Sequence, residues 1–79
     1  MKIYAVKDTI VGTFMVPFYQ HNEAEARRGF ELAINSNGEI AKIYKDLQLF
    51  ELGEFDEITG EIKSEVRFIA NGAEMKRGE

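Results

Sequence analysis

The stretch Leu47–Ile62, LQLFELGEFDEITGEI, decides the fold of this chain. Its first half is rich in the leucine and phenylalanine side chains that a half-buried strand packs against its neighbours. The segment Asp56–Gly60, DEITG, has the chemistry of a tight turn, and Gly60 stands where a type I turn followed by a bulge requires a residue of positive φ. The stretch therefore predicts a β-hairpin.

The apolar residues of this hairpin do not all fall on one face. Leu47 and Leu49 share one face of the predicted strand, whereas Phe50 and Leu52 share the other. We therefore expect either a strand that is covered on both faces or a bulge near Gly53 that resets the alternation.

One helix is predicted ahead of the hairpin. Asn22 is a good N-cap residue, and Glu25 follows it at the spacing of a capping box. The apolar face at helical spacing consists of Ala26, Gly29, Phe30, Ala33 and Ile34. Within it, Gly29 suggests a close approach to the sheet. The run 36–38, Ser-Asn-Gly, is expected to end the helix with a left-handed residue at Asn37 or Gly38.

The remaining segments complete a small antiparallel sheet. Lys2–Lys7 reads as an interior strand, and Thr13–Tyr19 reads as an edge strand because Pro17 lacks a ladder N–H. Ile40–Asp46 is predicted as a short helical turn, and Val66–Ile69 as a last short strand. The expected fold class is α+β, in the order ββα(short turn)ββ, with one domain over residues 1–70 and a polar, flexible tail over residues 71–79.

Composition limits the classes of function. The chain has 79 residues, no cysteine and a net charge of −4. Residues 1–45 carry six basic and five acidic side chains, whereas residues 46–79 carry four and nine. Such a small core gains from self-association, so a homo-oligomer is compatible with the sequence. No stretch is long and apolar enough to span a membrane, and the early charges argue against a signal peptide, so a cytoplasmic protein is expected.

No residue set indicates catalysis. His21 is the only histidine, and it lies directly before the predicted N-cap without a nucleophile in its pattern. The acidic hairpin residues match no calcium loop. The sequence thus predicts a protein that is not an enzyme and that has no cofactor, no catalytic residues and no metal site.

Two candidate binding surfaces remain. The basic and aromatic residues that could contact phosphates and unpaired bases of single-stranded DNA are Lys2, Tyr4, Lys7, Arg27, Arg28, Lys42, Tyr44 and Lys45. The alternative is a protein-interaction surface on the acidic hairpin or the Phe14–Tyr19 segment, with candidate residues Phe14, Phe18, Tyr19, Glu51, Glu54 and Glu57. The simpler explanation of the first set is core aromatics with dispersed surface lysines. The simpler explanation of the second is a solvated or edge-protecting acidic hairpin with aromatics that cover the core.

The order of these motifs also resembles a known family. The chain has MKIYAVKD at its start, then FMVPFYQHNEAEARRGFELAIN, then DLQLFELGEFDEITGEI. These features resemble the small nonstructural protein of gokushoviruses, which are single-stranded DNA phages of the Microviridae. The resemblance covers residues 1–62, and LFELGEFDEITG is its most specific string.

The resemblance implies a phage protein that is made in the host cytoplasm and is absent from the virion. It also implies a role in DNA replication, either through single-stranded DNA binding or in the switch from duplex replication to single-strand synthesis. A phage or host replication protein is the implied protein partner. The resemblance assigns no catalytic residue.

Overall fold

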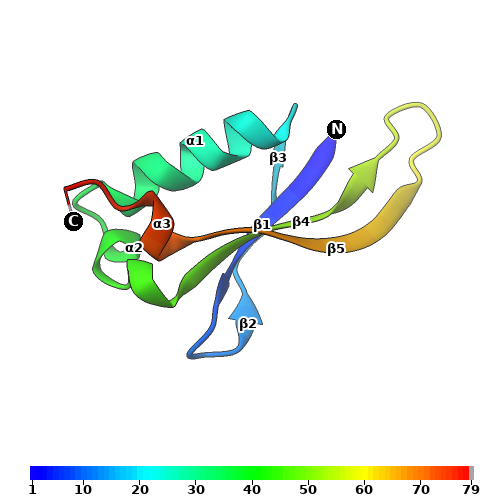
Figure 1. Ribbon diagram of the computed structural model, residues 1–79. Coiled ribbons are helices and arrows are strands. Elements are labelled where there is room, and N and C mark those ends of the chain that lie inside the picture. The colour runs from blue at the N-terminus through cyan, green and yellow to red at the C-terminus, as the bar shows by residue number, and fades with distance from the viewer. Residues whose placement is uncertain (79) are drawn as a thin grey trace.

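The protein forms one antiparallel sheet with a long helix across one of its faces, as the computed structural model of residues 1–78 shows (Figure 1). The strands are β1 (Lys2–Asp8), β2 (Thr13–Phe14), β3 (Phe18–Gln20), β4 (Leu47–Phe55) and β5 (Ile62–Asn71). The helices are α1 (Glu23–Ile34), α2 (Glu39–Lys42) and α3 (Gly72–Met75), with a 3₁₀ turn η1 (Tyr44–Asp46). The predicted α+β class is confirmed.

The sheet order is β2-β1-β4-β5, and β3 also pairs with β1. Every described pair of strands is antiparallel. In this order β5 forms one edge of the sheet, and β2 and β3 share the other edge. The predicted edge strand at Thr13–Tyr19 is thus present as two short pieces on either side of Pro17, because proline cannot donate to a ladder.

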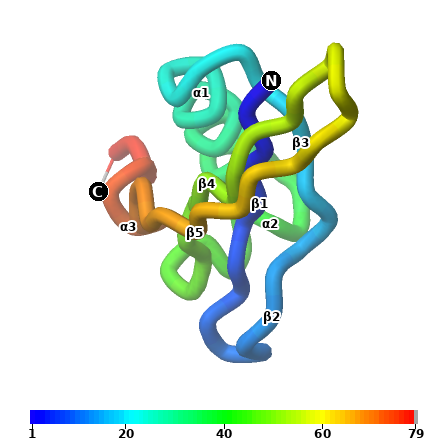
Figure 2. Tube along the Cα trace, turned by 90° about the vertical axis from the view of Figure 1, so that its right-hand side faces the viewer, coloured from blue at the N-terminus to red at the C-terminus, as the bar shows by residue number. Residues whose placement is uncertain are grey.

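The core lies between α1 and the sheet. Figure 2 shows α1 and α3 on one side of β1, β4 and β5. The buried side chains from the sheet include Tyr4, Leu47 and Leu49, and they meet Phe30 and Ile34 of α1. The tip of the β4–β5 hairpin extends away from the helix, which gives the molecule its elongated shape of 43 × 24 × 18 Å (Figure 1).

The hairpin forms as predicted, with Gly60 at φ 79°. The bulge near Gly53 is also present, because the β1–β4 and β4–β5 registers both shift there. Gly53 has φ 153°, and an added Cβ would overlap the carbonyl oxygen of Lys63. The return strand is longer than expected, since Val66–Ile69 continues β5 rather than forming a separate strand.

Two further predictions differ from the structure. Asn22 caps α1 by accepting a 2.9 Å bond from the N–H of Glu25, but the helix ends at Asn35 with φ −98°, so Asn37 and Gly38 form no left-handed cap. Gly29 is exposed and an added Cβ would meet no atom within 4 Å, so it makes no close approach to the sheet.

The residues after Asn71, predicted as a flexible tail, include the short helix α3. Asn71 and Glu74 form a capping box, and Met75 packs against the core. Gly72 is buried so close to Tyr44 that an added Cβ would overlap the Tyr44 carbonyl oxygen. The local capping pattern at Asn71 is therefore supported by tertiary contact. Glu79 lies outside the described residues.

Candidate functional site

The two faces of the sheet differ in what covers them. Tyr4 and Val6 of β1 are buried against the helix side. Because side chains alternate along a strand, Ile3, Ala5 and Lys7 lie on the opposite face. The helices of residues 1–78 pack on the side of Tyr4, where α1, α2 and α3 contribute Phe30, Ile40 and Met75 to the core, so the opposite face is open.

The uncovered face carries a row of aromatic rings. Phe14 is opposite Lys7 in the register, and Phe50 is opposite both Ala5 and Phe68. The ring centroid of Phe50 lies 5.3 Å from that of Phe14 and 5.7 Å from that of Phe68, and both contacts are edge-to-face. Such contacts fix the rings in place relative to each other.

A second aromatic pair extends this row. Tyr19 is opposite Ile3, and its ring centroid lies 6.4 Å from that of Phe55. The exposed fractions of Phe14, Tyr19 and Phe68 are 41%, 55% and 45%, which is high for large aromatic residues. We call the surface formed by Lys7, Phe14, Tyr19, Phe50, Phe55 and Phe68 the aromatic face.

Lys7 supplies a positive charge to the aromatic face. Its Nζ lies 5.6 Å from the Phe14 ring centroid, which is within the range of a cation–π contact. Within residues 1–78, Lys7 forms no salt bridge with a carboxylate. Its ammonium group can therefore contact an external phosphate or carboxylate without breaking an ion pair.

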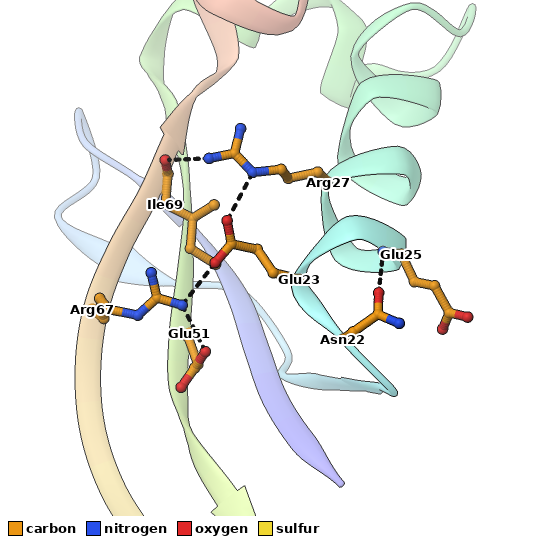
Figure 3. A network of polar contacts seen from close by, with 7 residues as sticks. All are labelled: Asn22, Glu23, Glu25, Arg27, Glu51, Arg67 and Ile69. Carbon is orange, nitrogen blue, oxygen red and sulfur yellow. Dashed lines mark hydrogen bonds and ion pairs between the residues drawn. The ribbon is translucent and has the colours of Figure 1, made fainter.

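The helix side carries a network of ion pairs between α1 and the sheet (Figure 3). Arg67 Nη2 lies 2.8 Å from Glu23 Oε1 and 2.8 Å from Glu51 Oε1. Arg27 Nε donates to Glu23 Oε2 at 3.0 Å, and Lys2 Nζ lies 3.5 Å from Glu51 Oε2. The network ties the first turn of α1 to β4 and β5.

This network also shifts protonation equilibria. Hydrogen bonds from Arg67 and Arg27 lower the pKa of Glu23. The two carboxylates raise the pKa of Arg67. Burial, followed by the nearby Glu51 charge, raises the pKa of Tyr4, so its hydroxyl stays neutral at physiological pH. These shifts belong to a structural network that joins helix and sheet.

A third cluster surrounds Tyr44 at the far end of the sheet. The Nζ atoms of Lys45 and Lys76 lie 5.9 Å and 5.2 Å from the centroid of the same Tyr44 ring. Lys42, two residues earlier, pairs with Glu39 at 3.2 Å. Lys45 and Lys76 form no salt bridge within residues 1–78, so neither ammonium group is held by a carboxylate.

The residues predicted to bind nucleic acid do not form one surface. Lys7 lies on the aromatic face, and Lys42, Tyr44 and Lys45 lie at the far end of the sheet. Lys2 and Arg27 are held in the ion-pair network, and Arg28 is exposed on α1.

Tyr4 is fully buried and stacks on Phe18 at 6.0 Å, so its ring is not accessible to a base. The reason is the strand alternation, which turns Tyr4 toward the helix.

The predicted protein-interaction residues are also divided between surfaces. Phe14 and Tyr19 belong to the aromatic face, whereas Phe18 is half-buried on the helix side. Glu51 is 8% exposed and bound to Arg67, so it is not part of an exposed acidic surface. The exposed Glu54 lies near the end of β4, and the exposed Glu57 lies in the hairpin turn.

The sequence-based candidate set omitted four residues of these surfaces. Phe50, Phe55 and Phe68 belong to the aromatic face, and Lys76 joins the Tyr44 cluster. The signal for Phe50 was present, because its position on the second face of β4 was recognised. The signal for Phe68 required the true length of β5.

The structure offers one apolar groove and no metal cluster among residues 1–78. No group of three or more His, Asp or Glu side chains in this range is arranged to hold a metal ion. An open groove of about 430 Å³ lies between α1 and the β2–β3 segment, lined by Met15, Val16, Phe18, Phe30, Ala33 and Ile40. None of the helices in this range is long and apolar enough to cross a membrane.

Comparison with known proteins gives one match. A family model described as "Phage ORF5 protein" matches residues 1–75, which is nearly the whole chain. No curated protein and no solved structure matches.

Proposed function

The chain belongs to the Phage ORF5 protein family, and from this premise we propose that it is a non-enzymatic accessory protein of phage genome replication that binds single-stranded DNA on its aromatic face. In this proposal it is the small nonstructural protein of a gokushovirus, acts in the host cytoplasm and is absent from the virion. The observation that supports DNA binding most directly is the row of exposed rings on an uncovered sheet face.

An open sheet with exposed rings suits unpaired bases. Single strands present the π-faces of their bases, and each base that stacks on an aromatic side chain contributes about 1–3 kcal/mol. Phe14, Phe50 and Phe68 hold each other in edge-to-face contacts, so the platform is ordered before a strand arrives. Little side-chain entropy is then lost on binding.

The charge of the protein sets the expected salt dependence. The net charge is −4, and Lys7 is the cation that the geometry places on the aromatic face. For single strands, the logarithm of affinity falls with the logarithm of salt concentration with a slope of about −0.7 per neutralised phosphate. We therefore expect weak binding with a shallow salt dependence, carried mainly by stacking.

Fluorescence anisotropy with a labelled oligonucleotide of about 16 nucleotides tests this proposal. Phe68→Ala and Phe14→Ala should each weaken binding to the single strand by about tenfold. Leu32→Ala is the matched control, since Leu32 is 57% exposed on α1, away from the aromatic face. No binding at about 100 μM protein, or equal losses in the control, would reject the proposal.

A protein partner is the second candidate, favoured by a separate observation. The hairpin turn next to the aromatic face exposes Glu54, Asp56, Glu57 and Glu61, which suits a basic protein surface better than a phosphate backbone. In this reading the partner is a phage or host replication protein. Retention of one specific protein from infected host lysate after nuclease treatment, lost in Glu57→Lys, would support it.

The two candidates separate cleanly in these experiments. Glu57→Lys should leave oligonucleotide binding unchanged or slightly stronger, because it removes a negative charge. Phe68→Ala with unchanged retention of the partner would place the protein contact on the hairpin turn alone. Mass spectrometry of purified virions tests the remaining part of the proposal, and detection of this chain as a stoichiometric component would contradict it.

A further inference from the structure

Within residues 1–78, β5 is a long edge strand with no strand on its outer side. It pairs with β4 on one side and ends the sheet order on the other. Residues 62–68, IKSEVRF, are all exposed. An edge of this length is a template for pairing with another strand unless its side chains oppose the pairing.

The hydrogen bonds of the hairpin show which backbone groups of β5 point outward. The N–H and C=O of Phe55 bond to Met1, at 2.8 Å and 2.9 Å, so they point toward β1. Asp56 donates to the carbonyl of Glu61 at 2.9 Å, so Glu61 faces β4 and the next residue, Ile62, faces outward. By alternation, Ser64 and Val66 also present outward N–H and C=O groups.

The side chains indicate that this alternation continues along β5. Lys63 is opposite Glu54, which is itself opposite Lys2 on the helix side. Arg67 also points to the helix side, where it reaches Glu23. The β4–β5 register shifts once in this stretch, because three steps of β4 from Glu51 to Glu54 match four steps of β5 from Lys63 to Arg67. Lys63 and Arg67 nevertheless share a face, as their even spacing in an alternating strand requires.

These outward groups restrict how a second copy can pair. Two identical antiparallel strands related by a two-fold axis must place outward-facing residues opposite each other. With the axis at Ser64, Lys63 is opposite Glu65 of the other copy, and Glu61 is opposite Arg67. Ile62 is opposite Val66, so an apolar pair forms on the aromatic-face side.

Other axes are less favourable. An axis at Val66 would place Lys63 opposite the buried Ile69, and an axis at Ile62 would use turn residues as strand partners. An axis at Glu65 would keep Ser64 opposite Val66 but would place Lys63 opposite Arg67, which repels. The charge pattern therefore favours the Ser64 register over its neighbours.

We propose that β5 pairs antiparallel with β5 of a second copy, about a two-fold axis at Ser64. The pairing joins the two sheets into one continuous sheet and places the aromatic faces of both copies on the same side. Within residues 1–78, Lys63 and Glu65 form no salt bridge, so both side chains are available for the intermolecular pair. This proposal is independent of what the aromatic face binds.

Sedimentation velocity of the full chain, at protein concentrations up to about 1 mM, tests the proposal. The wild-type protein should form a dimer in this range. Glu65→Lys and Lys63→Glu should each raise the dissociation constant by about tenfold or more, since each creates two like-charge pairs across the axis.

Two charge-swap experiments then test the register. An equimolar mixture of the two single variants should form a mixed dimer, because every like-charge pair becomes an opposite-charge pair. The double variant Lys63→Glu/Glu65→Lys, which keeps the wild-type net charge, should dimerise as the wild type does. Circular dichroism of each variant confirms that the fold is retained.

A backbone variant keeps the test decisive if a charge reversal disturbs folding. Ser64→Pro removes an outward N–H at the proposed axis without removing a bond to β4, and edge strands tolerate proline at such positions. It should abolish the dimer. A monomeric wild type at the highest concentration, unchanged dimerisation of the single variants, or no recovery in the mixture would overturn the proposal.

Discussion

Arg67 and Glu23 lie 44 residues apart in the sequence and are joined by a hydrogen bond of 2.8 Å between Nη2 and Oε1. The same Arg67 nitrogen donates to Glu51 at 2.8 Å, so one guanidinium connects β5, β4 and the first turn of α1 (Figure 3). Glu51 is 8% exposed, which means that its charge depends on these partners. The contact thus fixes the helix against the sheet.

Replacing Arg67 with methionine should lower the free energy of unfolding by about 1–2 kcal/mol, because Glu51 would keep its buried charge with Lys2 as its remaining ion-pair partner. Partial exposure of Arg67 keeps the loss below that of a fully buried pair. Urea denaturation of the wild type and the variant measures this change in the free energy of unfolding. Arg77→Met is the control, since Arg77 lies 3.9 Å from Glu31 at the surface and should change stability by less than about 0.5 kcal/mol. Equal losses of stability in Arg67→Met and Arg77→Met would show that the ion-pair network does not stabilise the fold.

The same network predicts how stability changes with pH. Arg67 and Arg27 lower the pKa of Glu23 below its ordinary value of 4.5. The folded state therefore binds fewer protons at Glu23 than the unfolded state does, so this stabilisation is complete above pH 4.5 and is lost as the pH falls through the lower, folded-state value. Glu23→Gln should reduce the acid dependence of stability, and this difference should shrink in about 1 M salt. Urea midpoints measured from neutral to acidic pH give the comparison, and parallel curves for the two proteins would contradict it.

Tyr4 has a buried hydroxyl that finds no hydrogen-bond partner among the protein atoms of residues 1–78. Its ring is fully buried and stacks on Phe18. Tyr4→Phe removes the hydroxyl and keeps the ring, so stability should stay the same or rise by about 1 kcal/mol. Tyr4→Ala also removes the ring, and as the reference it should lower the free energy of unfolding by about 3–5 kcal/mol. A loss of more than about 1 kcal/mol in Tyr4→Phe would show that the hydroxyl makes a stabilising bond.

The parts of the fold that were predicted from sequence are those set by local chemistry. Asn22 caps α1 through the N–H of Glu25, three residues away, and Gly60 takes the positive φ that its turn requires. Both signals act within a few residues, so they can be read without knowledge of the partners. The same holds for Pro17, which restricts its segment to the sheet edge.

The candidate surfaces required long-range information. Register shifts near Gly53 decide which side of the sheet each β4 residue faces, and a sequence pattern shows only that the alternation breaks. From the sequence, Arg27 looked free to contact a phosphate. In the structure it bonds to Glu23 and to the carbonyl of Ile69, and Ile69 lies 42 residues away along the chain, so a local pattern could not show this partner. Tyr4 looked like an accessible aromatic because its burial depends on α1.

Glycine substitutions test the corrected role of Gly29 against two glycines that the fold requires. Gly29 lies inside α1 with open space around its Cα, so Gly29→Ala should raise stability by about 0.5–1 kcal/mol through helix propensity. Gly53→Ala and Gly72→Ala should each lower stability by at least about 1 kcal/mol, because their Cβ atoms would overlap the carbonyl oxygens of Lys63 and Tyr44. Thermal and urea unfolding of the three variants provide the measurement. If Gly29→Ala is less stable than the wild type, Gly29 does approach the sheet closely, as the sequence suggested. If Gly72→Ala leaves the stability unchanged, α3 is not held against Tyr44 in solution.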